Sequence, residues 1–193
     1  MAKPSGRPIR DEVIDAACTK VQQIGVNSLS FGVLAKELGI SAPSIHHHFR
    51  TKDDLIGAVA ARYRAQFGDF VDTIIQDSAA DRLMAYAALF DDTTRADLMC
   101  FCGSVASDWL TTGEPARQEV GAFFEDQQRW LRAQLERGVE RDEFAPIPDA
   151  AITARLFLAA LEGAMLITRA GDERSRPGLL AGELVSSLRR RID

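Results

Sequence analysis

Apolar residues recur at helical spacing along most of the chain, and no strand signals appear after residue 52. The first periodic stretch spans residues 10–24 and ends at Gly25, a residue typical of helix C-termini. With the two short helices described next, the chain predicts an all-α protein of about nine helices. The remaining predicted helices cover residues 52–75, 79–91, 96–111, a stretch beginning at 114, 150–170 and 173–190.

Helix start and stop signals are concentrated in one segment of the N-terminal quarter. Ser30 is suited to cap a short helix, and Gly39 is suited to the left-handed conformation that ends it. Ser41 can cap a second short helix. Thr51 and Asp54 have the spacing of a capping box at the start of a third helix. Two short helices joined by a tight turn predict a helix-turn-helix motif, whose second helix reads the DNA major groove.

This segment resembles the N-terminal domain of the tetracycline-repressor (TetR) family of transcription regulators. The resemblance covers roughly a quarter of the chain without a gap. It implies a helix-turn-helix DNA-binding domain with a basic arm over residues 1–51, and a ligand-binding and dimerisation domain over 52–193. The matching residues are Arg10, Ile14, Ala17, Gly25, Leu34, Ala35, Leu38, Gly39, Ile40, Ser41, Ser44, Ile45, His48, Phe49, Lys52 and Leu55.

The chain departs from the family at His46, where the family usually has a tyrosine that reaches a DNA phosphate. An imidazole can make the same contact, more strongly when protonated. The triplet His46–His48 also raises the question of a metal site, but consecutive helical residues point about 100° apart and cannot converge on one ion. The residues we predict to contact DNA are Lys3, Arg7, Ser30, Ala42, Pro43, Ser44, His46, His47 and Lys52.

The net charge of −5 is unevenly distributed. Residues 1–66 carry nine Lys and Arg against six Asp and Glu, whereas residues 67–193 carry fourteen against twenty-two. The basic part is attracted to phosphate and the acidic part is repelled, which orients the protein on DNA. The positive part is small, so we expect a homodimer that reads two half-sites of a palindromic operator.

The stretch 150–170 is apolar on nearly every side, and a small chain is unlikely to cover all of it. We therefore expect a partner chain on its remaining face. The resemblance implies the same, because TetR-family proteins dimerise through a four-helix bundle of their last two helices. The predicted interface residues are Leu161, Met165, Leu184 and Leu188.

The resemblance also implies a small-molecule pocket in the C-terminal domain. Aromatic residues there could line it and would favour an apolar or aromatic effector, although ordinary core packing is the alternative for each of them. Cys100 and Cys102 lie two apart and would point to opposite sides of a helix. Core packing is favoured for both, with an electrophile- or redox-sensing thiol as the alternative. The predicted pocket residues are Phe67, Phe70, Tyr86, Trp109, Phe124 and Gln127.

Several classes of protein are disfavoured by what the sequence lacks. It has no apolar run of about 18 residues and no signal-peptide pattern, which favours a cytoplasmic protein without a membrane segment. An odd number of cysteines argues against a disulfide framework. No nucleophile–base pattern, phosphate loop or metal-ligand spacing suggests an enzyme, a cofactor or a metal. A helical scaffold protein is also disfavoured, because such a protein would not need the helix-turn-helix pattern.

Overall fold

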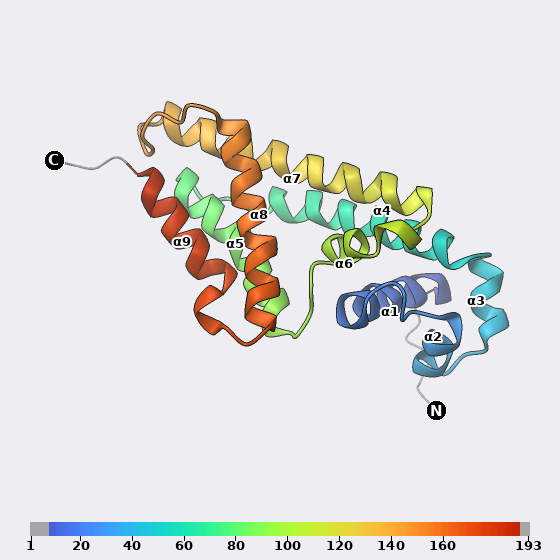
Figure 1. The fold of residues 1–193 in the computed structure, drawn as a ribbon. Coiled ribbons are helices and arrows are strands. Elements are labelled where there is room, and N and C mark those ends of the chain that lie inside the picture. The colour runs from blue at the N-terminus through green and yellow to red at the C-terminus, as the bar shows by residue number, and fades with distance from the viewer. Residues whose placement is uncertain (1–7, 190–193) are drawn as a thin grey trace. The chain divides into compact units, whose positions relative to one another are not determined.

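The computed structural model describes residues 8–189. Within this range the chain forms nine α-helices and two short 3-10 helices, and it contains no strand (Figure 1). The prediction of an all-α protein is therefore confirmed. Lys3 and Arg7, which we predicted to contact DNA, lie outside the described residues.

The described chain packs as two compact units, each made of two separate stretches. Among the described residues, the first unit combines 8–67 with 101–123, and the second combines 68–100 with 124–189. The division thus follows packing and not sequence order, and the expected boundary at residue 52 falls inside the first unit. Two long helices contribute residues to both units: α4 (Lys52–Asp72) and α7 (Glu114–Glu140).

The first unit is built around α1, which packs against α2, α3 and α6. Its core consists of side chains that the helical spacing predicted to face inward, among them Val13, Ile14, Leu34 and Leu55, which are at most 2% exposed. Besides the first part of α4 and the start of α7, the helices of this unit are α1 (Ile9–Ile24), α2 (Phe31–Leu38), α3 (Ala42–His48), α6 (Phe101–Ser107) and η1 (Trp109–Thr111).

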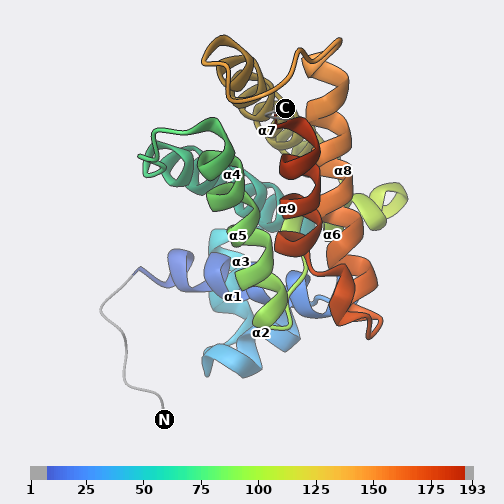
Figure 2. The same cartoon turned by 90° about the vertical axis from the view of Figure 1, so that its left-hand side faces the viewer.

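The second unit is a bundle in which α5, α8 and α9 lie side by side (Figures 1 and 2). Asp149 begins α8 by accepting a hydrogen bond from the amide of Ile152 at 2.9 Å. Gly138 near the end of α7 allows the ring of Phe144 to pack on it, because a Cβ there would lie 2.1 Å from that ring. The further helices of this unit are α5 (Ala79–Arg95), α8 (Ala150–Arg169), η2 (Glu173–Ser175) and α9 (Pro177–Leu188).

Two predicted helices begin later than the sequence pattern indicated. The helix expected at 96–111 begins at Phe101, because Asp97 adopts a left-handed conformation with φ 56° and closes a turn. Only η1 continues it. The helix expected at 173–190 begins at Pro177, which occupies its first turn because a proline needs no hydrogen-bond acceptor there. The preceding residues form the short helix η2.

Among the described residues, α8 is the one helix that is long and apolar enough to cross a membrane, judged by length and composition alone. A core helix meets the same criterion. Seven of its residues are buried, and it packs against α5 and α9. Its other apolar side chains are exposed in the single chain: Ile152, Leu156, Leu166 and Ile167.

Candidate nucleic-acid interface and effector site

The turn between α2 and α3 has the capping arrangement that the sequence predicted. The hydroxyl of Ser30 accepts a hydrogen bond from the amide of Val33 at 3.2 Å, and Gly39 ends α2 with φ 66°, in the left-handed region. Ser41 caps α3 by accepting from the amide of Ser44 at 3.3 Å. Because these contacts fix both helix ends, they orient α3 against α2. We call α2, α3 and the turn between them the reading head.

The helix α3 has one buried face and one exposed face. Ile45 is 0% exposed and Phe49, its C-terminal cap residue, is 3% exposed, as the spacing predicted. His46, His47 and Pro43 are exposed, and the imidazole of His46 packs edge-on against Phe31 with ring centres 4.6 Å apart. The face that could meet a DNA groove is therefore polar and largely open to solvent.

Two predicted contact residues are less open than their neighbours. Ala42 and Ser44 are half-buried, and the Ser44 hydroxyl lies 2.8 Å from the hydroxyl of Ser41. His48 is exposed and lies against His47 with ring centres 5.2 Å apart. Among the described residues, no group of three potential ligands is placed to hold a metal ion.

Lys52 opens α4 behind a capping box that the sequence predicted. The Thr51 amide donates to Asp54 at 3.0 Å, and the Asp54 amide donates to the Thr51 hydroxyl at 3.1 Å. The ammonium group of Lys52 donates to the backbone carbonyl of Val26 at 3.2 Å. Lys52 therefore already has a partner within the protein. A DNA phosphate would have to share the ammonium group with the Val26 carbonyl or take its place.

The loop between α1 and α2 is held by the carboxylate of Asp108, which follows α6 in the chain. One oxygen accepts from the amides of Val26 and Asn27 at 2.9 and 3.2 Å, and the other accepts from the Asn27 side chain at 2.7 Å. Thr111 donates to the same side chain at 2.8 Å. Asp108 therefore holds the loop that leads into α2.

One exposed cation at the reading head was missed by sequence reasoning. Arg50 follows α3 directly and is exposed, so it can reach a phosphate beside the groove that α3 would enter. The signal was available, since a basic residue directly after a recognition helix is well placed for such a contact. Arg10 has a different role, because its guanidinium packs 5.4 Å from the ring centre of Phe49.

The predicted pocket residues are divided between the two units. Tyr86 and Gln127 meet in the interior of the second unit, where the tyrosine hydroxyl donates a hydrogen bond to the amide oxygen of Gln127. Phe70 and Phe124 belong to the same unit and are half-buried. Phe67 belongs to the first unit and packs against Phe123, with ring centres 5.7 Å apart.

Trp109 is the most exposed of the predicted pocket residues. It lies on η1 of the first unit, 40% exposed, and Arg117 packs over its ring at 5.4 Å. The sequence pattern placed it inside a continuous helix. Because the helix ends at Ser107, the indole is carried to the surface instead.

A polar group surrounds Tyr86, and we call Tyr86, Cys100, Gln127 and Glu162 the interior polar cluster. The thiol of Cys100 donates a hydrogen bond to the carboxyl of Glu162. Burial raises the pKa of Glu162, an effect that this hydrogen bond opposes. Burial raises the pKa of Tyr86 well above its ordinary value, and the nearby charges of Glu162 and Cys100 raise it further. Glu162 was not predicted, because its helix reads as apolar on almost every side.

The cysteines are poorly placed to act as sensors. Cys100 and Cys102 are at most 4% exposed. Cys18 is half-buried, and burial followed by the charge of Asp15 raises its pKa to about 12. A reactive cysteine needs an accessible thiolate, so these surroundings disfavour the redox-sensing alternative.

Comparison with known proteins identifies the family. Residues 13–59 match the family model described as bacterial regulatory proteins, tetR family. Residues 79–179 match the model described as the tetracyclin repressor-like C-terminal domain, which covers more than half of the chain. The chain belongs to the TetR family. Its members are transcriptional regulators.

Individual relatives agree with this assignment. The transcriptional regulator BetI of Cronobacter sakazakii is 32% identical over 99 residues, which span 48% of this chain and 49% of BetI. The class D tetracycline repressor of Escherichia coli is 34% identical over 61 residues, 32% of this chain and 28% of that protein. The chain thus spans about half the length of the first of these relatives and less of the second.

A solved structure supports the fold over nearly the whole chain. The TetR-family transcriptional regulator of Agrobacterium tumefaciens superposes with a TM-score of 0.89 at 27% identity. The superposition covers 94% of this chain and 97% of the Agrobacterium protein. Both parts of the TetR-family architecture are therefore represented in this chain.

The predicted dimer residues of this TetR-family chain lie deeper than expected. Leu161 and Met165 are 0% exposed within the single chain, so they belong to the core of the second unit and not to a surface. Leu184 and Leu188 on α9 are half-buried. The apolar residues that α8 and α9 do present to solvent are Ile152, Leu156, Leu166, Ile167 and Leu179.

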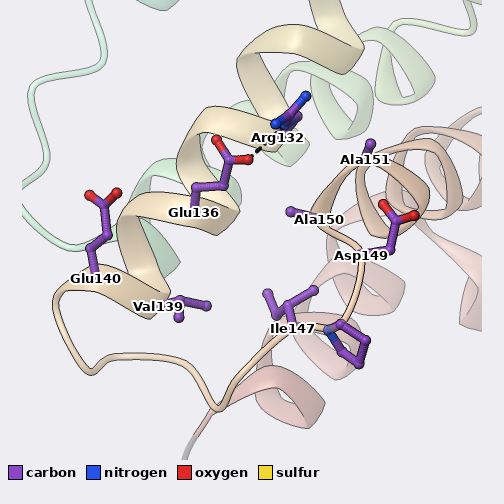
Figure 3. Close-up of a pocket in the computed structure, with 9 residues that line it drawn as sticks. Arg132, Glu136, Val139, Glu140, Ile147, Asp149, Ala150 and Ala151 are labelled. Atoms are coloured by element: carbon purple, nitrogen blue, oxygen red, sulfur yellow. Dashed lines mark hydrogen bonds and ion pairs between the residues drawn. The ribbon is translucent and has the colours of Figure 1, made fainter.

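A surface hollow of about 640 Å³ lies between the end of α7 and the start of α8 (Figure 3). Arg132 and Glu136 on its α7 side form an ion pair at 2.7 Å. Asp149 on its α8 side already caps that helix. Because these charged groups are engaged with the protein or with each other, the hollow is not assigned a ligand.

Proposed function

We propose that this TetR-family protein is a ligand-responsive transcriptional repressor that binds a palindromic operator as a homodimer in the cytoplasm. The reading head carries the proposal. Its second helix, α3, buries Ile45 and turns Pro43, His46 and His47 to solvent. A short helix with a packed inner face and a polar outer face is the form in which this motif enters a major groove.

The residues around the reading head divide by the kind of contact they can make. Pro43, Ser44 and His46 lie on or beside the open face of α3 and would meet base edges or the adjoining backbone. Arg50 and Lys52 follow α3 and would meet phosphates, which position the protein without reading sequence. Ser30, Ala42 and His47, together with Lys3 and Arg7 of the N-terminal arm, complete the proposed contact set.

Dimerisation is supported by the uncovered apolar side of α8. Ile152, Leu156 and Leu166 are 51%, 64% and 61% exposed, and they fall on one stripe of the helix. Gly163 lies on the same stripe, and a Cβ added there would meet nothing within 4 Å. A stripe of this kind is suited to close approach by the same helix of a second copy, which would bury it.

The effector would bind in the second unit, where the interior polar cluster lies. The helices α4 and α7 contribute residues to both units, so a ligand that favours one arrangement of these helices would also act on the first unit. Such a ligand releases DNA only if it binds the released state more tightly than the DNA-bound state. The class D tetracycline repressor among the relatives supports repression of transcription over activation.

The proposal can be tested with purified protein and genomic DNA. Bound fragments are selected, the shared palindrome is placed in a labelled duplex, and affinity is followed by fluorescence anisotropy. We expect nanomolar binding that weakens steeply with salt, and a stoichiometry of two chains for each palindrome. Affinity that does not depend on the sequence of the duplex would contradict the proposal.

A further inference from the structure

The interior polar cluster holds two polar atoms whose hydrogen-bonding capacity is unused. The side-chain nitrogen of Gln127 and one carboxyl oxygen of Glu162 are shielded from solvent and have no hydrogen-bond partner among residues 8–189. The Glu162 residue as a whole is half-buried, but this carboxyl oxygen is shielded from solvent. Buried polar atoms without partners are rare because each costs stability, which makes two in one cluster informative.

The two atoms belong to one continuous set of contacts. Gln127 uses its amide oxygen to accept from Tyr86, and the phenol of Tyr86 is close enough to Glu162 to feel its charge. The remaining contact of the Glu162 carboxyl is the thiol of Cys100, a weak donor. Helices α5, α7 and α8 and the residue before α6 therefore bring an amide donor and a carboxyl acceptor to the same buried region.

Aromatic rings adjoin this polar pair. The ring of Tyr86 lies 5.3 Å from that of Trp130 and 5.3 Å from that of Phe90, measured between centres. The faces of such rings attract cations, with tryptophan the strongest. A carboxyl group next to aromatic rings, with no basic residue paired to it in the described chain, is a setting that favours an incoming organic cation over an anion.

We propose that the effector is a small organic cation whose charged nitrogen pairs with Glu162 and whose neighbouring oxygen accepts from Gln127, with an apolar body against the aromatic rings. This inference rests on the proposed function and replaces the uncharged apolar effector expected from the sequence. A cation supplies the charge that the buried carboxyl lacks, and an acceptor supplies the partner that the Gln127 amide lacks.

A matched series of three compounds tests the inference on the full-length protein: 2-amino-1-phenylethanol, 2-phenylethylamine and 2-phenylethanol. They share a phenyl body and differ in having both the amine and the hydroxyl, the amine alone, or the hydroxyl alone. Binding is measured by thermal shift and calorimetry without DNA. We expect the amino alcohol to bind most tightly and the uncharged alcohol to bind at least about tenfold more weakly than the amine.

Variants assign the preference to particular atoms. Glu162→Gln keeps the shape and removes the charge, so the amine should lose its advantage over the alcohol. Gln127→Leu should remove the advantage of the amino alcohol over the amine. Glu125→Gln, an exposed change on α7 of the same unit, is the control and should alter neither preference.

A measurement on the unaltered protein covers the case in which a variant does not fold. A cation that pairs with Glu162 lowers the raised pKa of this group, so binding should release protons. Calorimetry in two buffers of different ionisation enthalpy detects this release. Tyr86 and Cys100 are the titratable groups that adjoin Glu162.

The outcomes separate the two proposals. Equal binding of the amine and the alcohol, or no binding of either amine at millimolar concentration, overturns the inference. Operator affinity is measured on the same samples. Sequence-specific DNA binding without any preference for cations leaves the proposed regulator in place, whereas a cation preference without DNA binding would overturn the function and not the site.

Discussion

The reading head and the interior polar cluster use polar side chains in opposite ways. In the head, Ser30 and Ser41 bond to backbone amides three residues away and fix a surface that stays open to solvent. In the cluster, Gln127 and Glu162 come from different helices and leave two buried atoms without partners. The hydrogen bonds of the reading head are complete in the free protein. The two atoms of the cluster gain partners only when a ligand binds. Four changes test this contrast.

Leu156→Glu should have the largest effect. This side chain is 64% exposed on α8, so a charge there spares the fold of the single chain but blocks burial against a second copy. We expect monomers and a loss of operator affinity of about 100-fold, because two linked heads no longer share an effective concentration. Sedimentation velocity and anisotropy measure both effects.

Two neighbouring changes calibrate that result. Arg155→Glu alters the charge of an exposed residue beside Leu156 and should leave the dimer intact. Leu161→Glu places a charge in the core and should unfold the second unit, since this residue is 0% exposed. A Leu156→Glu protein that remains a dimer of normal affinity would exclude this face of α8 from the interface.

Asp108→Ala should reduce stability by about 1–3 kcal/mol, because it removes three hydrogen bonds to the loop at Val26 and Asn27. Urea unfolding measures the loss. Asp92→Ala is the control, since Asp92 is largely exposed and its pairing with Arg95 should be worth less than about 1 kcal/mol. Equal losses from the two changes would show that Asp108 does not hold the loop.

Lys52→Ala separates a phosphate contact from a structural one. If the ammonium group leaves the Val26 carbonyl for a phosphate, the slope of log affinity against log salt should decrease by about 1.8, because the homodimer loses one phosphate contact from each chain and each is worth about 0.9. Arg50→Ala, two residues earlier and at an exposed position, should give the same decrease. A loss of stability with an unchanged slope would mean that Lys52 acts only within the protein.

Glu162→Gln should have the smallest effect, and its sign depends on pH. Burial raises the pKa of Glu162 in the folded chain, so any stability that this group confers is present at low pH and is lost as pH rises through the raised pKa. The variant should therefore unfold at a higher temperature than the unaltered chain at about pH 8, by a few degrees. The gap should close as the pH falls towards 4.5, the ordinary value of the group. A gap that is the same at every pH would rule out titration of Glu162 as its cause.

The sequence predicted the reading head well because its determinants are local. Ser30, Gly39, Ser41 and the pair Thr51 and Asp54 act on groups at most a few residues away, so spacing alone revealed them. Helical periodicity likewise identified the inner side of α3. What spacing could not reveal was the alternative partner of Lys52, because Val26 lies 26 residues away in the chain.

The second unit was predicted less completely because its determinants are distant in sequence. An apolar helix does not show which side its own chain covers, so Leu161 and Met165 were assigned to an interface although they are buried. Tyr86 and Gln127 were both predicted to line one pocket, and the structure joins them by a hydrogen bond. Glu162 escaped notice because a single acidic residue in an apolar helix has no recognisable spacing.

The shortness of α3 has a consequence for the energetics of DNA recognition. Seven residues are too few for a helix that is stable by itself in water, so its shape depends on Ser41, Ile45 and Phe49. Because these residues hold the helix in the free protein, association need not order it. The heat-capacity change on binding should accordingly match the apolar surface buried at the interface, without the larger contribution of a segment that folds on its target.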